Sequence, residues 1–308
     1  MKIKHLYFYV FFLFLACQPT VDNKGRIQIV CTTGMIGDMV SNIIGNQADV
    51  VSIMGPGVDP HLYKASRGDL SLLSNADIII YNGVHLEGKM GSIFEKLKNR
   101  KLIYKVADGL EESDLINNSD FVGAYDPHIW FDLNLWSKAC LHLTEELSKV
   151  EGLSKDSILT QGKTYAQEIL RMSQWVKDEI QSIPKPQRVL ITAHDAFSYF
   201  GKAYDIEVKG LQGISTASEY GLRDLSDLVN FIVQRNIQAV FVESSVSRKA
   251  LEAVIRGCKE KGHHATIGGT LYGDAMGEKE TKEAFYLGMV KHNVNTIVAG
   301  LKKETYEK

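Results

Sequence analysis

Short apolar runs alternate with amphipathic segments along most of the 308-residue chain. In the first half, strand-like apolar runs cover residues 27–33, 49–54, 77–81 and 101–106, and apolar positions at helical spacing cover residues 35–44 and 66–75. In the second half, strand-like runs at 188–193, 206–210, 239–243 and 265–268 alternate with helical patterns at 225–235, 247–261 and 282–301. This alternation predicts an α/β fold of two lobes, each with a mostly parallel four-stranded sheet flanked by helices.

One long helical pattern separates the two halves. Its apolar residues recur every three, four or seven positions, which places them on one face of a helix: Ile158, Tyr165, Ile169, Met172, Val176 and Ile180. Ser154 and Asp156 supply start signals, whereas Pro184 stops the pattern, which predicts a helix over residues 154–183. About 28 helical residues extend about 42 Å, which is enough to cross both lobes. We therefore expect one rigid helix that joins the lobes and restricts their bending.

The first 17 residues have the features of a secretory signal. Lys2 and Lys4 precede an apolar run of about 11 residues, which is too short to span a bilayer. The run ends in a small residue before Cys17, and this end resembles a bacterial lipobox with Cys17 as the lipid attachment site. It departs from the usual pattern at Phe14, where leucine is usual. A plain signal peptide cut at another position is the alternative. The pattern predicts a lipoprotein anchored to the membrane outside the cytoplasm, in the periplasm or on the cell surface.

These features give a domain organisation, because the chain is too long for one ordinary domain and fits two lobes. We expect a signal peptide over residues 1–17, a polar tether over 18–25, an N-terminal lobe over 26–153, a linking helix over 154–183 and a C-terminal lobe over 184–308.

The charges of the chain are balanced. Its 35 basic and 37 acidic residues give a net charge of −2, without a long run of either sign. Nucleic-acid binding requires a basic surface, so we expect no nucleic-acid partner.

Three cysteines follow Cys17, and an odd number cannot form a complete disulfide framework. We expect Cys31, Cys140 and Cys258 to be small buried apolar residues. A single bridge between Cys31 and Cys140 remains open.

Four short segments place a metal-ligating side chain beside turn-forming residues: 55–61, 125–130, 191–195 and 272–276. His61, His194 and Asp274 each follow a predicted strand, and His128 lies just before a predicted helix. Open parallel sheets bind ligands in the crevice beyond the carboxyl ends of their strands. Loops from both lobes can therefore meet at one cleft.

Two of these segments contain the triplet Asp-Pro-His, at residues 59–61 and 126–128. Proline fixes its own φ and biases the preceding residue toward extended geometry, so the histidine that follows is held before an ion arrives. A ligand that is already held loses less entropy on binding. The repeated triplet therefore favours a binding role over helix or strand packing.

Three neutral imidazoles and one carboxylate form a ligand set that suits Zn²⁺, and Mn²⁺ if the carboxylate binds through both oxygens. A single histidine is more often a hydrogen-bonded core residue, but four comparable loops on two lobes favour a shared site. We predict one divalent ion bound by four residues: His61, His128, His194 and Asp274.

Three further carboxylates are candidates for supporting these ligands. Glu243 ends a strand beside the expected crevice and could hydrogen-bond a ligand histidine, with an ordinary place at the strand end as the alternative. Asp195 and Asp132 are candidates for the same role.

The chain resembles the TroA-like metal-binding receptors of ABC transporters, and the treponemal TroA-type proteins most of all. The resemblance covers residues 27–300 and is carried by residues 54–61, 81–87, 126–132, 192–197, 210–215, 243–245 and 273–277. It implies two α/β lobes, a long connecting helix and a metal between the lobes. The ligand pattern of the family falls on the four residues already chosen.

Family comparison leaves the metal open. Zinc-dedicated members often carry a loop rich in histidine ahead of the second ligand, whereas residues 112–124 contain no histidine. Many manganese-dedicated members have glutamate where this chain has His194. The nitrogen-rich set favours zinc by affinity, but the availability of each metal can reverse that choice.

The resemblance implies a receptor that captures Zn²⁺ or Mn²⁺ and passes it to the membrane permease of an ABC importer, and we expect a monomer. A secreted zinc hydrolase is one alternative, but catalytic zinc usually keeps an open position, and Asp274 would close the shell. The chain also lacks an HExxH helix and a nucleophile elbow. We therefore expect that the protein is not an enzyme. A surface adhesin is the third hypothesis.

Overall fold

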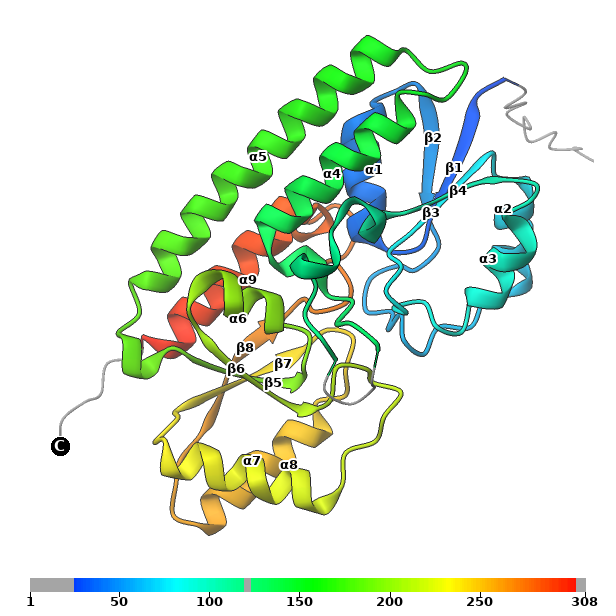
Figure 1. Cartoon of the computed structure of the whole chain (residues 1–308). Coiled ribbons are helices and arrows are strands. Elements are labelled where there is room, and N and C mark those ends of the chain that lie inside the picture. Colours follow the sequence, from blue (N-terminus) through cyan, green and yellow to red (C-terminus); the bar gives the residue numbers. More distant parts are fainter. Residues whose placement is uncertain (1–24, 119–122, 303–308) are drawn as a thin grey trace, which may run out of the picture.

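A computed structural model describes residues 25–118 and 123–302, and its strands fall into two groups, with the long helix α5 (Lys155–Gln181) running beside the first group toward the second (Figure 1). Cys17 and most of the predicted tether lie outside the described residues. Among the described helices, none is both long and apolar enough to cross a membrane.

The first group is one parallel sheet with the strand order β2-β1-β3-β4. Its strands are β1 (Ile27–Cys31), β2 (Ala48–Ser52), β3 (Ile78–Tyr81) and β4 (Leu102–Lys105). The helices around it are α1 (Gly34–Ile44), α2 (Arg67–Asn75), α3 (Gly91–Leu97) and α4 (Leu133–Leu147). Short 3-10 turns are η1 (Val106–Gly109), η2 (Glu112–Asp114) and η3 (Ile129–Phe131).

The side chains of this sheet alternate between two apolar layers, as the period of a strand requires. Ile29 and Ile80 face the layer that contains α1 and α4, whereas Val30 and Ile79 face the layer under α2 and α3. Both faces are therefore covered at the central strands β1 and β3, which explains why β3 appears in the sequence as a continuous apolar run.

The second group contains four parallel strands in two hydrogen-bonded pairs, β5-β6 and β7-β8. These strands are β5 (Val189–His194), β6 (Glu207–Gln212), β7 (Ala239–Glu243) and β8 (Thr266–Leu271). Since β5 and β7 contact each other, the expected four-stranded sheet is present as two adjacent pairs. Helices α7 (Leu222–Gln234) and α8 (Lys249–Glu260) cover one side, and α6 (Ser198–Tyr204) and α9 (Tyr286–Leu301) lie on the other (Figure 1).

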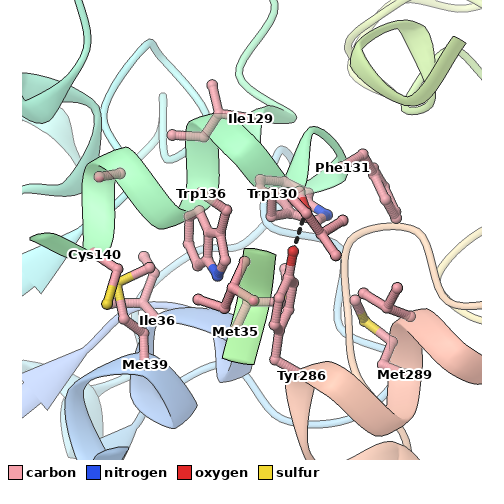
Figure 2. Packing of buried hydrophobic residues seen from close by; sticks show 14 of the residues in the cluster. Met35, Ile36, Met39, Ile129, Trp130, Phe131, Trp136, Cys140, Tyr286 and Met289 are labelled. Carbon is pink, nitrogen blue, oxygen red and sulfur yellow. Dashed lines mark hydrogen bonds between the residues drawn. The ribbon is translucent and has the colours of Figure 1, made fainter. Parts of the chain in front are cut away.

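The main apolar core is continuous between the two groups of strands. Figure 2 shows Met35 of α1 and Trp136 of α4 packed with Tyr286 of α9, although α9 is the last helix of the chain. The Tyr286 hydroxyl donates a buried hydrogen bond of 2.6 Å to the Trp130 carbonyl. The last helix therefore packs against the first lobe, as does α5, so a wide separation of the lobes would expose much apolar surface.

The predicted α/β class and the long helix are confirmed, and the differences concern short elements. The pattern at 282–301 predicted one helix, but Lys282–Ala284 forms a 3-10 turn (η5) and Phe285 is extended, so α9 begins at Tyr286. Helices α3 and α6 were not predicted. Another 3-10 turn, η4 (Lys185–Gln187), follows α5.

The three cysteines in the described residues are free and buried. This agrees with the expected packing role for Cys31, Cys140 and Cys258, and the bridge left open between Cys31 and Cys140 is absent. Burial raises the pKa of the Cys140 thiol to about 12, so it stays protonated and unreactive at neutral pH.

Candidate metal centre

The four predicted ligands come from both halves of the chain, and three of them lie at or after the carboxyl end of a strand. His61 lies in the loop after β2, and His128 directly precedes η3. His194 is the last residue of β5, and Asp274 lies in the loop after β8. One nitrogen of each imidazole and one oxygen of the carboxylate all lie within 4.8 Å of one another.

Three of the distances between these side chains are close to the edge length of a metal polyhedron. Nε2 of His61 lies 3.2 Å from Nε2 of His128. Asp274 Oδ1 lies 3.3 Å from Nε2 of His128, and Asp274 Oδ2 lies 3.3 Å from Nε2 of His194. Bonds of 2.0–2.1 Å to a tetrahedral zinc ion would separate neighbouring ligand atoms by about 3.3 Å.

Asp274 presents both of its carboxylate oxygens to the imidazoles. Among the described residues, neither oxygen meets the geometry of a hydrogen bond, although imidazole nitrogens lie close to each. Such buried acceptors need a partner, and a cation among the four side chains would supply it. Because the two oxygens face different histidines, the carboxylate can bind through one oxygen or through both.

The site is closed to solvent. His128 and His194 are fully buried, Asp274 is 1% exposed, and His61 is the most accessible at 5%. Burial lowers the pKa of His61 to about 3, so this imidazole is neutral and its Nε2 can bind an ion without losing a proton.

Each of the two fully buried histidines has a carboxylate next to its Nδ1, the ring nitrogen that faces away from the other predicted ligands. Asp126 Oδ1 lies 2.6 Å from Nδ1 of His128, and Glu243 Oε2 lies 2.8 Å from Nδ1 of His194. Burial alone would lower the pKa of each imidazole, but the adjacent carboxylates raise the pKa of His128 to about 9 and that of His194 well above its usual value. Asp126 is hydrogen-bonded to Nδ1 of His128, and Glu243 is in ion-pair contact with Nδ1 of His194. Both contacts leave Nε2 directed at the common centre.

In both Asp-Pro-His triplets the aspartate fixes the backbone of the histidine. Asp59 Oδ1 accepts a hydrogen bond of 2.9 Å from the His61 amide. Asp126 Oδ1 accepts one of 2.9 Å from the His128 amide. Each of these hydrogen bonds closes a turn between the aspartate side chain and the amide two residues later. The turn and the intervening proline together restrict the backbone that carries each imidazole.

Further contacts hold the loop that carries His128. Nδ2 of Asn82 donates a buried hydrogen bond of 2.9 Å to the Pro127 carbonyl. Glu87 in turn accepts hydrogen bonds from the Asn82 amide at 2.8 Å and from the Thr32 hydroxyl at 2.6 Å. The indole of Trp130 donates to the Gly273 carbonyl at 3.1 Å, which ties the His128 loop to the loop of Asp274.

The three supporting carboxylates predicted from the sequence occupy different positions. Glu243 contacts His194, as described above, and a Cβ at Gly273 would clash with its Oε2, so a larger residue there would displace this carboxylate. The Asp132 carboxylate accepts from the backbone at the start of α4, and Asp195 accepts from Ser198. Asp126, which contacts His128, was not predicted as a supporting carboxylate, although its place in the repeated Asp-Pro-His triplet could have indicated this role.

Known proteins resemble this chain along nearly its whole length. Residues 29–300 match the family model described as "Zinc-uptake complex component A periplasmic". The chain is 48% identical over 277 residues to the manganese-binding lipoprotein MntA of Bacillus subtilis, covering 90% of each. It is 44% identical over 277 residues to the zinc-binding protein TroA of Treponema pallidum, covering 90% of this chain and 89% of that protein.

The fold is also similar to a solved structure. The periplasmic zinc-binding protein TroA from Treponema pallidum has a TM-score of 0.88 to this chain at 44% identity, and the match covers 91% of this chain and 100% of that one.

Proposed function

Because the chain belongs to the family of periplasmic zinc-uptake component A proteins, we propose that it is an extracytoplasmic receptor that binds one Zn²⁺ or Mn²⁺ ion between two lobes and delivers it to an ABC importer. The observation that carries this proposal is the set of imidazole and carboxylate atoms within 4.8 Å of one another. His61, His128, His194 and Asp274 would be the ligands, with Glu243 and Asp126 orienting two of the imidazoles.

The donor set supports both metals. Three nitrogens and one oxygen at tetrahedral spacing suit Zn²⁺. The two inward-facing oxygens of Asp274 would supply a fifth donor and more oxygen character, which suits Mn²⁺. Two relatives are named for different metals, one for manganese and one for zinc, at 48% and 44% identity.

Capture without turnover is supported by the closure of the site. A hydrolytic zinc ion needs an open position for water and room for a substrate. Here the four side chains are almost completely buried, and the fourth protein ligand fills the position that water would take. We therefore propose a transport receptor and not an enzyme.

The cellular setting is the part of the proposal that rests on the sequence. We propose that Cys17 carries the lipid, that residues 18–25 tether the protein to the membrane, and that it works as a monomer with the permease. The lobes would be residues 26–153 and 184–308, joined by the helix within residues 154–183. Labelled fatty acid should enter the wild type but not Cys17→Ser, and absence of label from the wild type would contradict the anchor.

Metal analysis tests the central proposal. Protein purified without added metal, then exposed to equal Zn²⁺ and Mn²⁺, should hold one ion per chain, and X-ray absorption should detect about four to five nitrogen and oxygen neighbours near 2.0–2.2 Å. Absence of a bound ion would contradict the receptor. A bound water together with peptidase or esterase activity would support the hydrolase instead.

A further inference from the structure

A hydrogen bond joins the two lobes close to the metal site. The hydroxyl of Thr216, in the loop after β6, donates to Oδ2 of Asp59 at 2.6 Å. These residues are 157 positions apart in the chain, and Asp59 is two residues before His61. The contact therefore joins the loop of a predicted metal ligand to the opposite lobe.

The two oxygens of Asp59 have separate tasks. Oδ1 accepts from the His61 amide, whereas Oδ2 accepts from Thr216. In the other triplet, Asp126 Oδ1 binds both the amide and the ring nitrogen of its own histidine. The first triplet thus uses its aspartate to connect His61 with the second lobe, and the second triplet does not.

The Thr216 loop is itself held in place. Nε2 of Gln212, the last residue of β6, donates to the carbonyls of Thr216 at 2.8 Å and of Ser218 at 2.5 Å. Because these hydrogen bonds fix the backbone of the loop, the Thr216 hydroxyl is held in position and can resist movement of Asp59.

The most exposed of the four predicted ligands is His61. This residue is 5% exposed, whereas the other three predicted ligands are at most 1% exposed. The apolar core runs without interruption between the lobes through α4, α5 and α9, so wide hinge opening would be unfavourable. Movement of the His61 loop away from the second lobe is a smaller change that opens the site.

We propose that Thr216 and Asp59 form a latch that holds His61 against the metal and sets the rate at which the ion leaves. This inference rests on the proposed function and adds to it a positioning residue, Thr216, which does not contact the ion. Opening the latch breaks one hydrogen bond to a carboxylate, which is among the stronger kinds in proteins. The permease could favour release by competing for either partner.

The test compares release of Zn²⁺ from the full mature chain and its variants. Thr216→Val keeps the shape of the side chain and removes the hydroxyl, and Thr216→Ser keeps the hydroxyl. Zinc-loaded protein is mixed with excess chromogenic chelator, and the rate of zinc transfer is followed by stopped flow. Loss of the hydrogen bond should raise the dissociation rate about tenfold in Thr216→Val, whereas Thr216→Ser should release zinc near the wild-type rate.

Controls separate the latch from general stability. Thr164→Val makes the same chemical change on the exposed surface of α5, where the hydroxyl bonds only within its helix to Thr160, and should release zinc at the wild-type rate. The metal-free forms of all variants should melt within a few degrees of the wild type.

Two results would overturn the latch. Release from Thr216→Val at the wild-type rate would show that the hydroxyl does not hold His61. Equally fast release from Thr216→Ser and Thr216→Val would assign the effect to packing. A wild-type protein that binds no Zn²⁺ or Mn²⁺ would instead overturn the proposed function, and the latch with it.

Discussion

Glu243 Oε2 lies 2.8 Å from Nδ1 of His194, and the same glutamate accepts the His194 amide at 3.0 Å through Oε1. One carboxylate therefore fixes both the backbone and the ring of this histidine. With Nδ1 occupied, only Nε2 of His194 is available to an ion, and it points toward Asp274. This arrangement makes the imidazole a better donor because the carboxylate supports the charge that metal binding draws from the ring.

Replacing Glu243 by glutamine should weaken zinc binding about 10- to 100-fold, because the amide keeps the shape of the side chain but not its negative charge. Competition with a chelator of known affinity measures the change. Glu252→Gln, on the surface of α8, is the matched control and should bind zinc like the wild type. Equal affinities in both variants would show that the Glu243 charge does not support the site.

Removal of a ligand should abolish the stabilisation that the metal provides. An ion at about a thousand times its Kd adds about 4 kcal/mol to the free energy of unfolding, which corresponds to a rise in Tm of roughly 10 °C. Calorimetric scans with and without zinc should show this rise in the wild type and little of it in His61→Ala or His128→Ala.

The metal-free forms of these two variants should differ from each other. His61 is neutral, so its removal leaves no charged partner behind, whereas His128→Ala leaves the buried Asp126 carboxylate without its imidazolium. We expect metal-free His128→Ala to be less stable than His61→Ala by about 3 kcal/mol, because a broken buried ion pair leaves an uncompensated charge. Equal stabilities would contradict the protonated state of His128.

Much of the fold was predictable because burial dictates the residue types. All six residues of β5 are buried, and the strand begins with the apolar run Val189–Ile191. Helix α5 keeps buried positions at helical spacing from Ile158 to Ile180. Helices α3 and α6 were missed because each has seven residues and lacks a side-chain cap. Their helical form depends on packing against the rest of the chain, which local pattern does not contain.

The metal site was predictable to the extent that its residues carry distinctive chemistry beside turns. His61, His128, His194 and Asp274 were identified in this way, and the structure brings them together. The direction of a carboxylate is a property of the folded chain, so the sequence analysis named Asp132 and missed Asp126. The contact between Thr216 and Asp59 joins loops 157 residues apart and has no local signal.

The hydrogen bond from Tyr286 to Trp130 gives a prediction about stability. Tyr286→Phe should lower the free energy of unfolding by about 1–3 kcal/mol, since the buried Trp130 carbonyl loses a donor. Denaturant titration of the metal-free protein measures this change. Tyr125→Phe is the control, because its hydroxyl meets Glu112 at the surface and should change stability by less than about 0.5 kcal/mol. A loss no larger than in the control would contradict a structural role for the bond.

Metal affinity should rise with pH to well above neutrality, because protons compete with the ion for His128. Burial lowers the pKa of this imidazole, but Asp126 and Asp274 outweigh it and raise the pKa to about 9. Since the pKa of His194 is also raised well above its usual value, both metal-free rings are protonated at pH 7. Binding must release both protons, so affinity should fall by more than about tenfold per pH unit below 9. A histidine without these neighbours would place the midpoint at about 6.5. Calorimetry in buffers of different ionisation enthalpy counts the protons released.

The charge of Asp126 can be removed to test this origin of the pH dependence. Asp126→Asn keeps an acceptor for the His128 amide but eliminates the charge that, after burial, is the largest influence on the pKa of the ring. The midpoint should move down toward neutral pH, so fewer protons should be released on zinc binding at pH 7. Glu112→Gln at the protein surface alters an acidic group without touching His128 and should retain the wild-type midpoint. If Asp126→Asn also kept that midpoint, its carboxylate would not be the group that holds the proton on His128, and the competition between proton and metal would have to arise at another ligand.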